Sequence, residues 1–338
     1  MAETSVRDVV LDPDWLPHTF DAEGSNLTFA HVPGAARGGL MFLSDEHFAG
    51  NFVKAAFPAA EVAAQIGDAR RAPIHFIFHT SFCGSTLLAK ALGVPGTSIL
   101  KEPDVLINLA NRMIRSDDQG NRQRLELVLR LLERPFAPNE TVIAKPTNFA
   151  NRLLENILAQ RPKSKAVLLY SDVETFLRSL LKRGMFGRIF GRKLLTQLRS
   201  WSPLDFGYGP EELLQLTDVQ AAALAWLMQI HHFDAMARAF RDRVMLLDSP
   251  TFLASPADAI GKAQALFGLG LDRSGVEAIA AGPVFSKHSK FSDRDYDAEA
   301  RAKEHEAATI AHSEELEMVV KWIEAVAAQV GAPLKPGS

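Results

Sequence analysis

The stretch "HFIFHTSFCGSTLL", residues 75–88, has the pattern of a buried strand, a tight turn and the start of a helix. The first residues are apolar, Thr80 to Gly84 are mostly small, and Ser85 and Thr86 open a second apolar run. A turn between a strand and a helix binds anions well, because backbone N–H groups and the helix dipole point at one spot. The stretch therefore predicts a phosphate-binding loop at residues 80–86.

This loop lacks the lysine of an ATP-binding loop. The pattern G-x-x-x-x-G-K-[ST] requires a glycine near position 79 and a lysine at position 85, whereas this chain has His79 and Ser85. The lysine normally brings positive charge to the phosphates. We therefore expect the cation of this site to come from elsewhere in the chain.

The composition excludes several classes of protein. The chain has 338 residues, of which 47% are hydrophobic and 23% charged, as in an ordinary globular protein. A net charge of −3 argues against a general nucleic-acid binder. Cys83 is the only cysteine, which excludes an intramolecular disulfide and a cysteine-rich zinc site. We find no apolar run that would serve as a membrane span or a signal peptide, and expect a cytoplasmic location.

Short apolar segments alternate with helical segments through most of the chain. Continuous apolar runs are typical of strands buried on both faces of a parallel sheet, and their alternation with helices indicates right-handed crossovers. We predict the α/β class, with a parallel sheet flanked by helices. The expected strands are Ile74–His79, Thr97–Leu100, Thr141–Ala144, Ala166–Tyr170 and Val244–Leu247. The expected helices are 86–92, 122–134, 149–160, 173–183, 211–241 and 256–267, with a long amphipathic helix at 296–330.

Two regions interrupt this alternation. Residues 1–70 are rich in proline, glycine and aspartate, and we expect a small N-terminal cap, with a few strands, packed on a main domain at 71–338. Residues 184–209 contain glycines and aromatic residues and look like an insertion over the sheet.

Polar residues recur where the expected strands end. Ligands of open α/β sheets bind at the carboxyl ends of the strands. Each of these residues could alone be a solvated side chain, but their recurrence predicts a site for an anionic ligand with a carboxylate base. They are Lys101 and Glu102 after the second strand, Lys145 after the third, Ser171, Ser179 and Arg183 after the fourth, and Asp248 after the fifth.

Two segments are strongly basic. Residues 182–199 carry six lysines and arginines and no acidic residue, and like charges repel unless something anionic faces them. The loop at 286–290 holds Lys287, His288 and Lys290. It is either an exposed linker or a clamp for an anion.

Taken together, these motifs resemble the sulfotransferase family of the P-loop superfamily, in order and spacing over residues 74–330. The segment "SFCGSTL", residues 81–87, matches half of the family loop "PRSGTTL". Glu102 falls where the family has its base, and Lys145 where a lysine lies near the sulfonate. The segment "SDVETFLRS", residues 171–179, is similar to the family's "RDPRxxxxS", and the 286–290 loop is similar to a basic loop that closes over the nucleotide.

The resemblance implies a P-loop NTPase-like parallel sheet flanked by helices, in a sulfotransferase-like three-layer sandwich. It implies that the enzyme moves a sulfonyl group from 3′-phosphoadenosine 5′-phosphosulfate (PAPS) to a hydroxyl or amine acceptor. The chemistry of sulfonyl transfer itself requires no metal. The implied catalytic residues are Glu102, Lys145 and His79. The implied nucleotide-binding residues are Thr80, Ser81, Phe82, Cys83, Gly84, Ser85, Thr86, Ser171, Ser179, Arg183, Lys287, His288 and Lys290.

Two departures from the family pattern concern charge. Phe82 stands where the family loop has lysine or arginine, and Ser171 stands where an arginine binds the 3′-phosphate. Losing one such contact typically costs ~1.5–3 kcal/mol. The missing charge could come from His79, Lys101 or the lysines of the 286–290 loop.

Two other functions stay open at the level of sequence. A phosphotransferase would need a lysine at position 85 and a strand-end aspartate for magnesium, for which Asp248 is available. A catalytically inactive adaptor would explain Phe82 and Ser171, but not Glu102 and Lys145. The sequence identifies neither the acceptor nor the oligomeric state.

Overall fold

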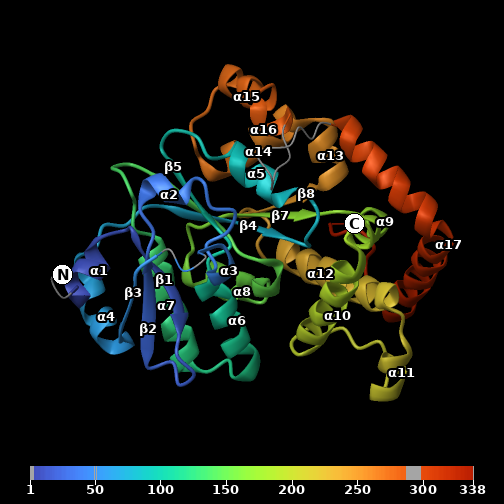
Figure 1. The fold of residues 1–338 in the computed structure, drawn as a ribbon, viewed down its shortest axis with the longest axis horizontal. Helices are drawn as coiled ribbons and strands as arrows, with labels where there is room; N and C mark the ends of the chain where they lie inside the picture. The colour runs from blue at the N-terminus through green and yellow to red at the C-terminus, as the bar shows by residue number, and fades with distance from the viewer. Residues whose placement is uncertain (1–3, 49, 51, 287–297, 338) are drawn as a thin grey trace. The chain divides into compact units, whose positions relative to one another are not determined.

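A computed structural model describes residues 4–48, 50, 52–286 and 298–337 of the chain. It contains a three-stranded sheet with the order β1-β2-β3 and a five-stranded sheet with the order β5-β6-β4-β7-β8 (Figure 1). Helices flank the larger sheet, and β4 and β5 each pair in parallel with β6. The predicted α/β class is therefore confirmed.

The strands of the larger sheet agree with the sequence prediction to within one residue, because each is a short apolar run bounded by turn residues. Every residue of β4 and of β7 is buried. The strands are β4 (Ile74–His79), β5 (Thr97–Lys101), β6 (Thr141–Lys145), β7 (Ala166–Tyr170) and β8 (Val244–Asp248).

The chain forms two compact units. The first contains Met1–Phe78, Ala89–Ala166 and Phe267–Gly270, and the second contains His79–Leu88, Val167–Leu266 and Leu271–Ser338. The expected boundary at residue 70 stays a prediction.

The first unit holds the N-terminal elements together with α6, α7 and α8. As expected for the N-terminal segment, strands are present, and β1 and β3 each pair antiparallel with β2. The sequence prediction missed α6. The elements are α1 (Val6–Leu11), β1 (Trp15–Phe20), β2 (Asn26–His31), α2 (Gly34–Arg37), α3 (Asp45–Phe48), β3 (Lys54–Pro58), α4 (Ala59–Gln65), η1 (Ile66–Asp68), α6 (Asp104–Arg115), α7 (Gln119–Leu132), η2 (Asn148–Ala150) and α8 (Leu153–Gln160).

A buried arginine anchors the N-terminal segment to the end of α7. Arg134 is 2% exposed and donates to the carbonyls of Val9, Val10 and Asp12 at 2.7, 2.9 and 3.0 Å. It also donates to the carbonyl of Trp15. Since a guanidinium carries five N–H donors, one side chain satisfies several buried carbonyls at once.

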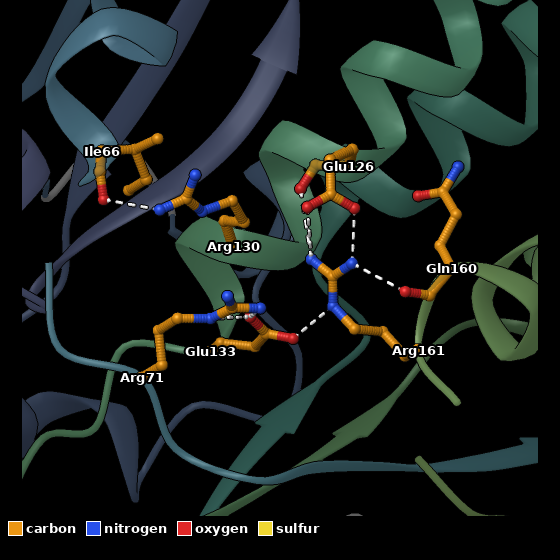
Figure 2. A network of polar contacts seen from close by, with 7 residues as sticks. All are labelled: Ile66, Arg71, Glu126, Arg130, Glu133, Gln160 and Arg161. Carbon is orange, nitrogen blue, oxygen red and sulfur yellow. Dashed lines mark hydrogen bonds and ion pairs between the residues drawn. The ribbon is translucent and has the colours of Figure 1, made fainter. Parts of the chain in front are cut away.

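An ion-pair network ties α7 to the residues around it (Figure 2). Arg161, which follows α8, pairs with Glu133 and Glu126. Arg71 pairs with Glu133 at 2.9 Å, and Arg130 donates to the carbonyl of Ile66 at 3.2 Å. Buried charges are tolerated only when they are paired in this way.

The second unit contains the phosphate-binding loop and the remaining helices. The helix α5 (Ser85–Ala91) begins here and ends in the first unit. The other helices are α9 (Val173–Leu181), α10 (Gly184–Arg199), α11 (Pro210–Gln215), α12 (Asp218–Ala239), α13 (Ser249–Ala254), α14 (Pro256–Phe267), α15 (Arg273–Ala280), α16 (Pro283–Ser286) and α17 (Ala298–Val330).

One predicted helix of this unit is wrong in detail, and the insertion expected at 184–209 stays a prediction. The segment expected as an insertion at 184–209 begins with α10, which packs beside α9 and α12 (Figure 1). The single helix expected at 211–241 is divided into α11 and α12. The first ends at Gln215, and Thr217 starts the second, because its hydroxyl accepts from the N–H of Gln220 at 3.1 Å in a capping box.

Within the part of the chain that the structure describes, no helix is long and apolar enough to cross a membrane.

Candidate functional site

The loop after β4 is held in an unusual backbone conformation. Ser81 and Phe82 have φ angles of 74° and 54°, and Gly84 has a φ of 85°. Left-handed backbone at two successive residues with side chains costs energy, and such strain is concentrated at functional sites. The conformation therefore supports the sequence-based choice of this loop.

Buried contacts within the second unit fix this loop. The N–H of Thr80 and the thiol of Cys83 both donate to the carbonyl of Leu169, at 3.1 and 3.3 Å. His79 accepts from the N–H of Ser81 through Nδ1 at 3.1 Å. Cys83 and His79, at 0% and 5% exposure, therefore position the loop.

Two hydroxyl groups of this unit are buried without a hydrogen-bond partner among the described residues. They are Thr80 Oγ1 and Ser171 Oγ, and both residues are 0% exposed. A buried hydroxyl that forms no hydrogen bond is costly. These two groups, with the polar side chains of Ser85 and Thr86, fit a polyanionic ligand that would accept their hydrogen bonds.

Phe82, in the middle of the loop, contacts two aromatic rings and an arginine. The Phe82 ring lies 5.9 Å from Phe176 and 5.2 Å from Phe190, measured between ring centroids. The guanidinium carbon of Arg183 is 4.9 Å from the centre of the Phe82 ring. Arg183 therefore brings positive charge to residue 82, through a cation–π contact.

The first unit holds the predicted carboxylate and lysine as an ion pair. Lys145 is fully buried, and its ammonium group contacts Glu102 Oε1. The Glu102 N–H donates to the Lys145 carbonyl at 2.7 Å, and the Glu102 side chain is 18% exposed. Glu102 has a φ of 51°, which is again left-handed. The structure thus joins two residues that the sequence prediction placed at neighbouring strand ends.

The sheet register explains this pairing. Lys101 is opposite Lys145 in the parallel β5–β6 pair, so Glu102 is the first residue beyond the paired strands. The left-handed turn at Glu102 directs its side chain to Lys145, while Pro103 precedes α6. The Lys145 ammonium also lies 5.3 Å from the centre of the Phe42 ring, a contact that the sequence prediction missed.

Lys101, a suggested source of the missing charge, makes structural contacts. Its ammonium donates to the carbonyls of Gly38 and Leu40. Burial, and then the charges of Lys90 and Lys145, lower the pKa of Lys101. These contacts favour a role in holding residues 38–40.

Ser179 is buried on α9, one turn beyond Phe176. Lys287, His288 and Lys290 lie outside the described residues, so their predicted clamp stays a prediction.

Two residues of α12 that the sequence prediction missed also hold this region. Gln229 is 0% exposed and its amide donates to the Thr80 carbonyl at 3.4 Å. The indole N–H of Trp226 donates to the Ser171 carbonyl at 2.9 Å. A glutamine that follows the apolar run at 221–228 of this helix is a usable signal, because a buried amide needs a partner. Trp226 offered no such signal.

A cluster of possible metal ligands lies in the first unit and includes Asp104, two residues after Glu102. Ligand atoms of His18, Asp45 and Asp104 lie within 4.8 Å of one another. The ammonium of Lys54 contacts Asp45, so a positive charge already occupies the cluster. We assign it a structural role.

No protein-family model and no curated protein matches this chain. The sulfotransferase domain from the curacin biosynthetic pathway aligns with 79% of this chain and 99% of its own length, at a TM-score of 0.43 and 12% identity. A sulfotransferase from Mycobacterium tuberculosis H37Rv aligns with 66% of this chain and 74% of its own length, at a TM-score of 0.36 and 17% identity. A sulfotransferase from Alicyclobacillus acidocaldarius aligns with 78% of this chain and 98% of its own length, at a TM-score of 0.37 and 12% identity. Similarity at this level establishes neither family nor activity.

Proposed function

We propose that the chain is a sulfotransferase-like enzyme that transfers a sulfonyl group from PAPS to a hydroxyl or amine. The observation that carries the proposal is the pair of Glu102 and Lys145. A carboxylate in strained left-handed backbone beside a fully buried ammonium is an expensive arrangement. It is the arrangement that proton removal next to developing negative charge requires.

The chemistry assigns a separate task to each residue. Transfer to a hydroxyl needs a base for the acceptor proton, positive charge for the oxygen that leaves, and alignment of the two. Glu102 takes the proton on its carboxylate. Lys145 holds that carboxylate by their ion pair and adds positive charge beside the transferring group. Neither step calls for a metal.

The loop and its neighbours would hold the nucleotide. The Thr80 and Ser171 hydroxyls, which lack partners among the described residues, would donate to phosphate oxygens. Arg183, stacked on Phe82, would supply the positive charge that the family pattern places at residue 82. Ser179 and the 286–290 loop remain predicted contacts to the distal phosphate.

A panel of nucleotides tests this proposal. Thermal unfolding is measured with PAPS, adenosine 3′,5′-bisphosphate, ATP with magnesium, and GTP with magnesium. A ligand at 100 times its Kd stabilises the folded state by ~2.7 kcal/mol. We expect stabilisation by the first two ligands, and stabilisation by ATP or GTP alone would contradict the proposal.

A catalytically inactive adaptor is the second candidate, favoured by the packing of Phe82 in an aromatic cluster where the family has a cation. It predicts no product from PAPS with any acceptor. The phosphotransferase is less favoured, because Asp248 accepts from the N–H of Thr251 at 3.0 Å and caps α13.

A further inference from the structure

A cavity of about 360 Å³ lies in the first unit, at the edge strand β5 of the larger sheet. Its walls come from α2, α5, β5 and the segment between α7 and β6. Pockets for small molecules commonly measure ~300–1,000 Å³, so the cavity can hold one. No residue that the proposed sulfonyl transfer uses lines it.

Three cationic side chains line this cavity, against one carboxylate. The cations are Arg37, Lys90 and Lys101, and the carboxylate is that of Glu140. Glu140 is already engaged, because its Oε2 accepts from the Ser98 hydroxyl at 2.7 Å and from the N–H groups of residues 136 and 137 at 2.9 and 3.0 Å. The cavity therefore holds more positive charge than its own side chains balance.

The two lysines of the cavity have no carboxylate partner among the described residues. Lys90, near the end of α5, is half-buried and forms no hydrogen bond or ion pair with any residue that the structure describes. The ammonium of Lys101 donates to the carbonyls of Gly38 and Leu40, which leaves one of its three N–H donors. Burial lowers the pKa of both lysines, and the charge of Lys90 lowers the pKa of Lys101 further. An anion in the cavity would stabilise both charges.

The arginine of the cavity is held in place but keeps a nitrogen without a partner. The guanidinium carbon of Arg37 lies 3.3 Å from the centre of the Phe136 ring, and its Nη2 pairs with Asp14 at 3.2 Å. Arg37 Nη1 is buried and has no hydrogen-bond partner among the described residues. Phe136 and Ile99 also give the cavity apolar surface, which suits the organic part of a ligand.

We propose that this cavity binds a phosphate monoester of a small organic molecule. Two ammonium groups without a carboxylate partner match a group with about two negative charges, which is the charge of a phosphate monoester near pH 7. A carboxylate or a sulfate ester carries only one. The proposal goes beyond sulfonyl transfer and does not depend on it, because the cavity and its charges belong to the first unit alone.

Calorimetric titration of the full chain tests the class of ligand. The probes are phenyl phosphate, phenyl sulfate and inorganic phosphate. The two esters have the same ring and the same number of oxygen atoms, and differ in charge. We expect phenyl phosphate to bind more tightly than either of the others. No binding of phenyl phosphate, or equal affinity for one of the other probes, would overturn the proposal.

Variants of Lys90 test whether phenyl phosphate binds in this cavity. Lys90→Gln should lose at least ~10-fold in affinity, because it removes a charge-assisted hydrogen bond, and Lys90→Arg, which keeps the charge, should stay within a few-fold of wild type. Lys163→Gln is the matched control, because Lys163 is exposed in the same unit and lies outside the cavity. Circular dichroism confirms that each variant is folded. Unchanged affinity in Lys90→Gln, or an equal loss in Lys163→Gln, would overturn the proposal.

Discussion

At the scale of single residues, the account depends most on the backbone of Glu102. Residue 102 adopts a left-handed φ of 51° although it is not a glycine, and such a conformation costs ~1–3 kcal/mol. The contacts that hold it are the N–H bond to the Lys145 carbonyl and the ion pair to the Lys145 ammonium. Under the proposed function, these contacts position the Glu102 carboxylate as the base.

The variant Glu102→Gln preserves the shape of this side chain and removes its basicity. We expect turnover to fall by ~10²–10⁴, because a positioned proton acceptor contributes that much. Nucleotide affinity should change little. Rates are measured with labelled PAPS once an acceptor is known.

Lys145→Ala is the companion variant, and it should also slow the chemical step, since it removes positive charge near the transferring group. If Glu102→Gln retained a rate within a few-fold of wild type, the base would be another residue.

His75 makes the fold sensitive to acid. Burial, with the charge of Lys165, lowers the pKa of His75 from 6.5 to about 4, although a hydrogen bond with the Phe267 backbone opposes the shift. His75 therefore takes up a proton near pH 6.5 in the unfolded chain, but only near pH 4 in the folded chain. We expect this group to lower the unfolding free energy by up to ~1.4 kcal/mol per pH unit between pH 6.5 and 4.

Urea unfolding of the wild type and of His75→Gln over this pH range measures the effect. Glutamine does not titrate but can still accept from the Lys165 N–H, which lies 3.1 Å from His75 Nδ1. The plot of unfolding free energy against pH should be less steep for the variant, by up to the ~1.4 kcal/mol per pH unit that His75 contributes. Parallel curves would show that His75 is not responsible.

At the scale of the elements, the strands were readable from sequence and several helices were not. Continuous apolar runs identify buried strands, whatever surrounds them. The glycines and exposed aromatic residues of α10 look irregular in sequence. They become helical because Gly187 and Gly191 permit contact with α9 and α12 at backbone distance. That contact is a tertiary effect that local propensity does not contain.

The variant Gly187→Ala tests this contact. A Cβ at this position would lie 2.0 Å from the Leu180 carbonyl oxygen, so we expect destabilisation of ~1–3 kcal/mol, despite the better helix propensity of alanine. Gly261→Ala in α14 is the matched control, because its added Cβ would meet Val276 at 3.9 Å. The control should be neutral or more stable by up to ~1 kcal/mol. Similar unfolding midpoints for the two variants would contradict the packing argument.

At the scale of the whole molecule, the sequence indicated which polar residues of the candidate site lie together, but not the residues that support them. Strand ends in a parallel sheet lie at one edge, so Glu102 and Lys145 could be found from the strand pattern alone. Phe42 and Trp226 could not, because the chain brings them in from distant segments. The contact of Arg183 with the Phe82 ring is likewise made only in the folded chain.

The central claim is that the loop binds the adenine nucleotide of sulfonyl transfer. The most direct measurement is calorimetric titration of adenosine 3′,5′-bisphosphate and adenosine 5′-phosphate into the wild type and Gly84→Val. At Gly84 an added Cβ would approach nothing nearer than Phe252, at 3.5 Å, but the φ of 85° opposes a side chain. We predict that the bisphosphate binds the wild type more tightly than the monophosphate and that the folded variant binds neither. Unchanged affinity in Gly84→Val, or equal affinity of the wild type for both ligands, would contradict the account.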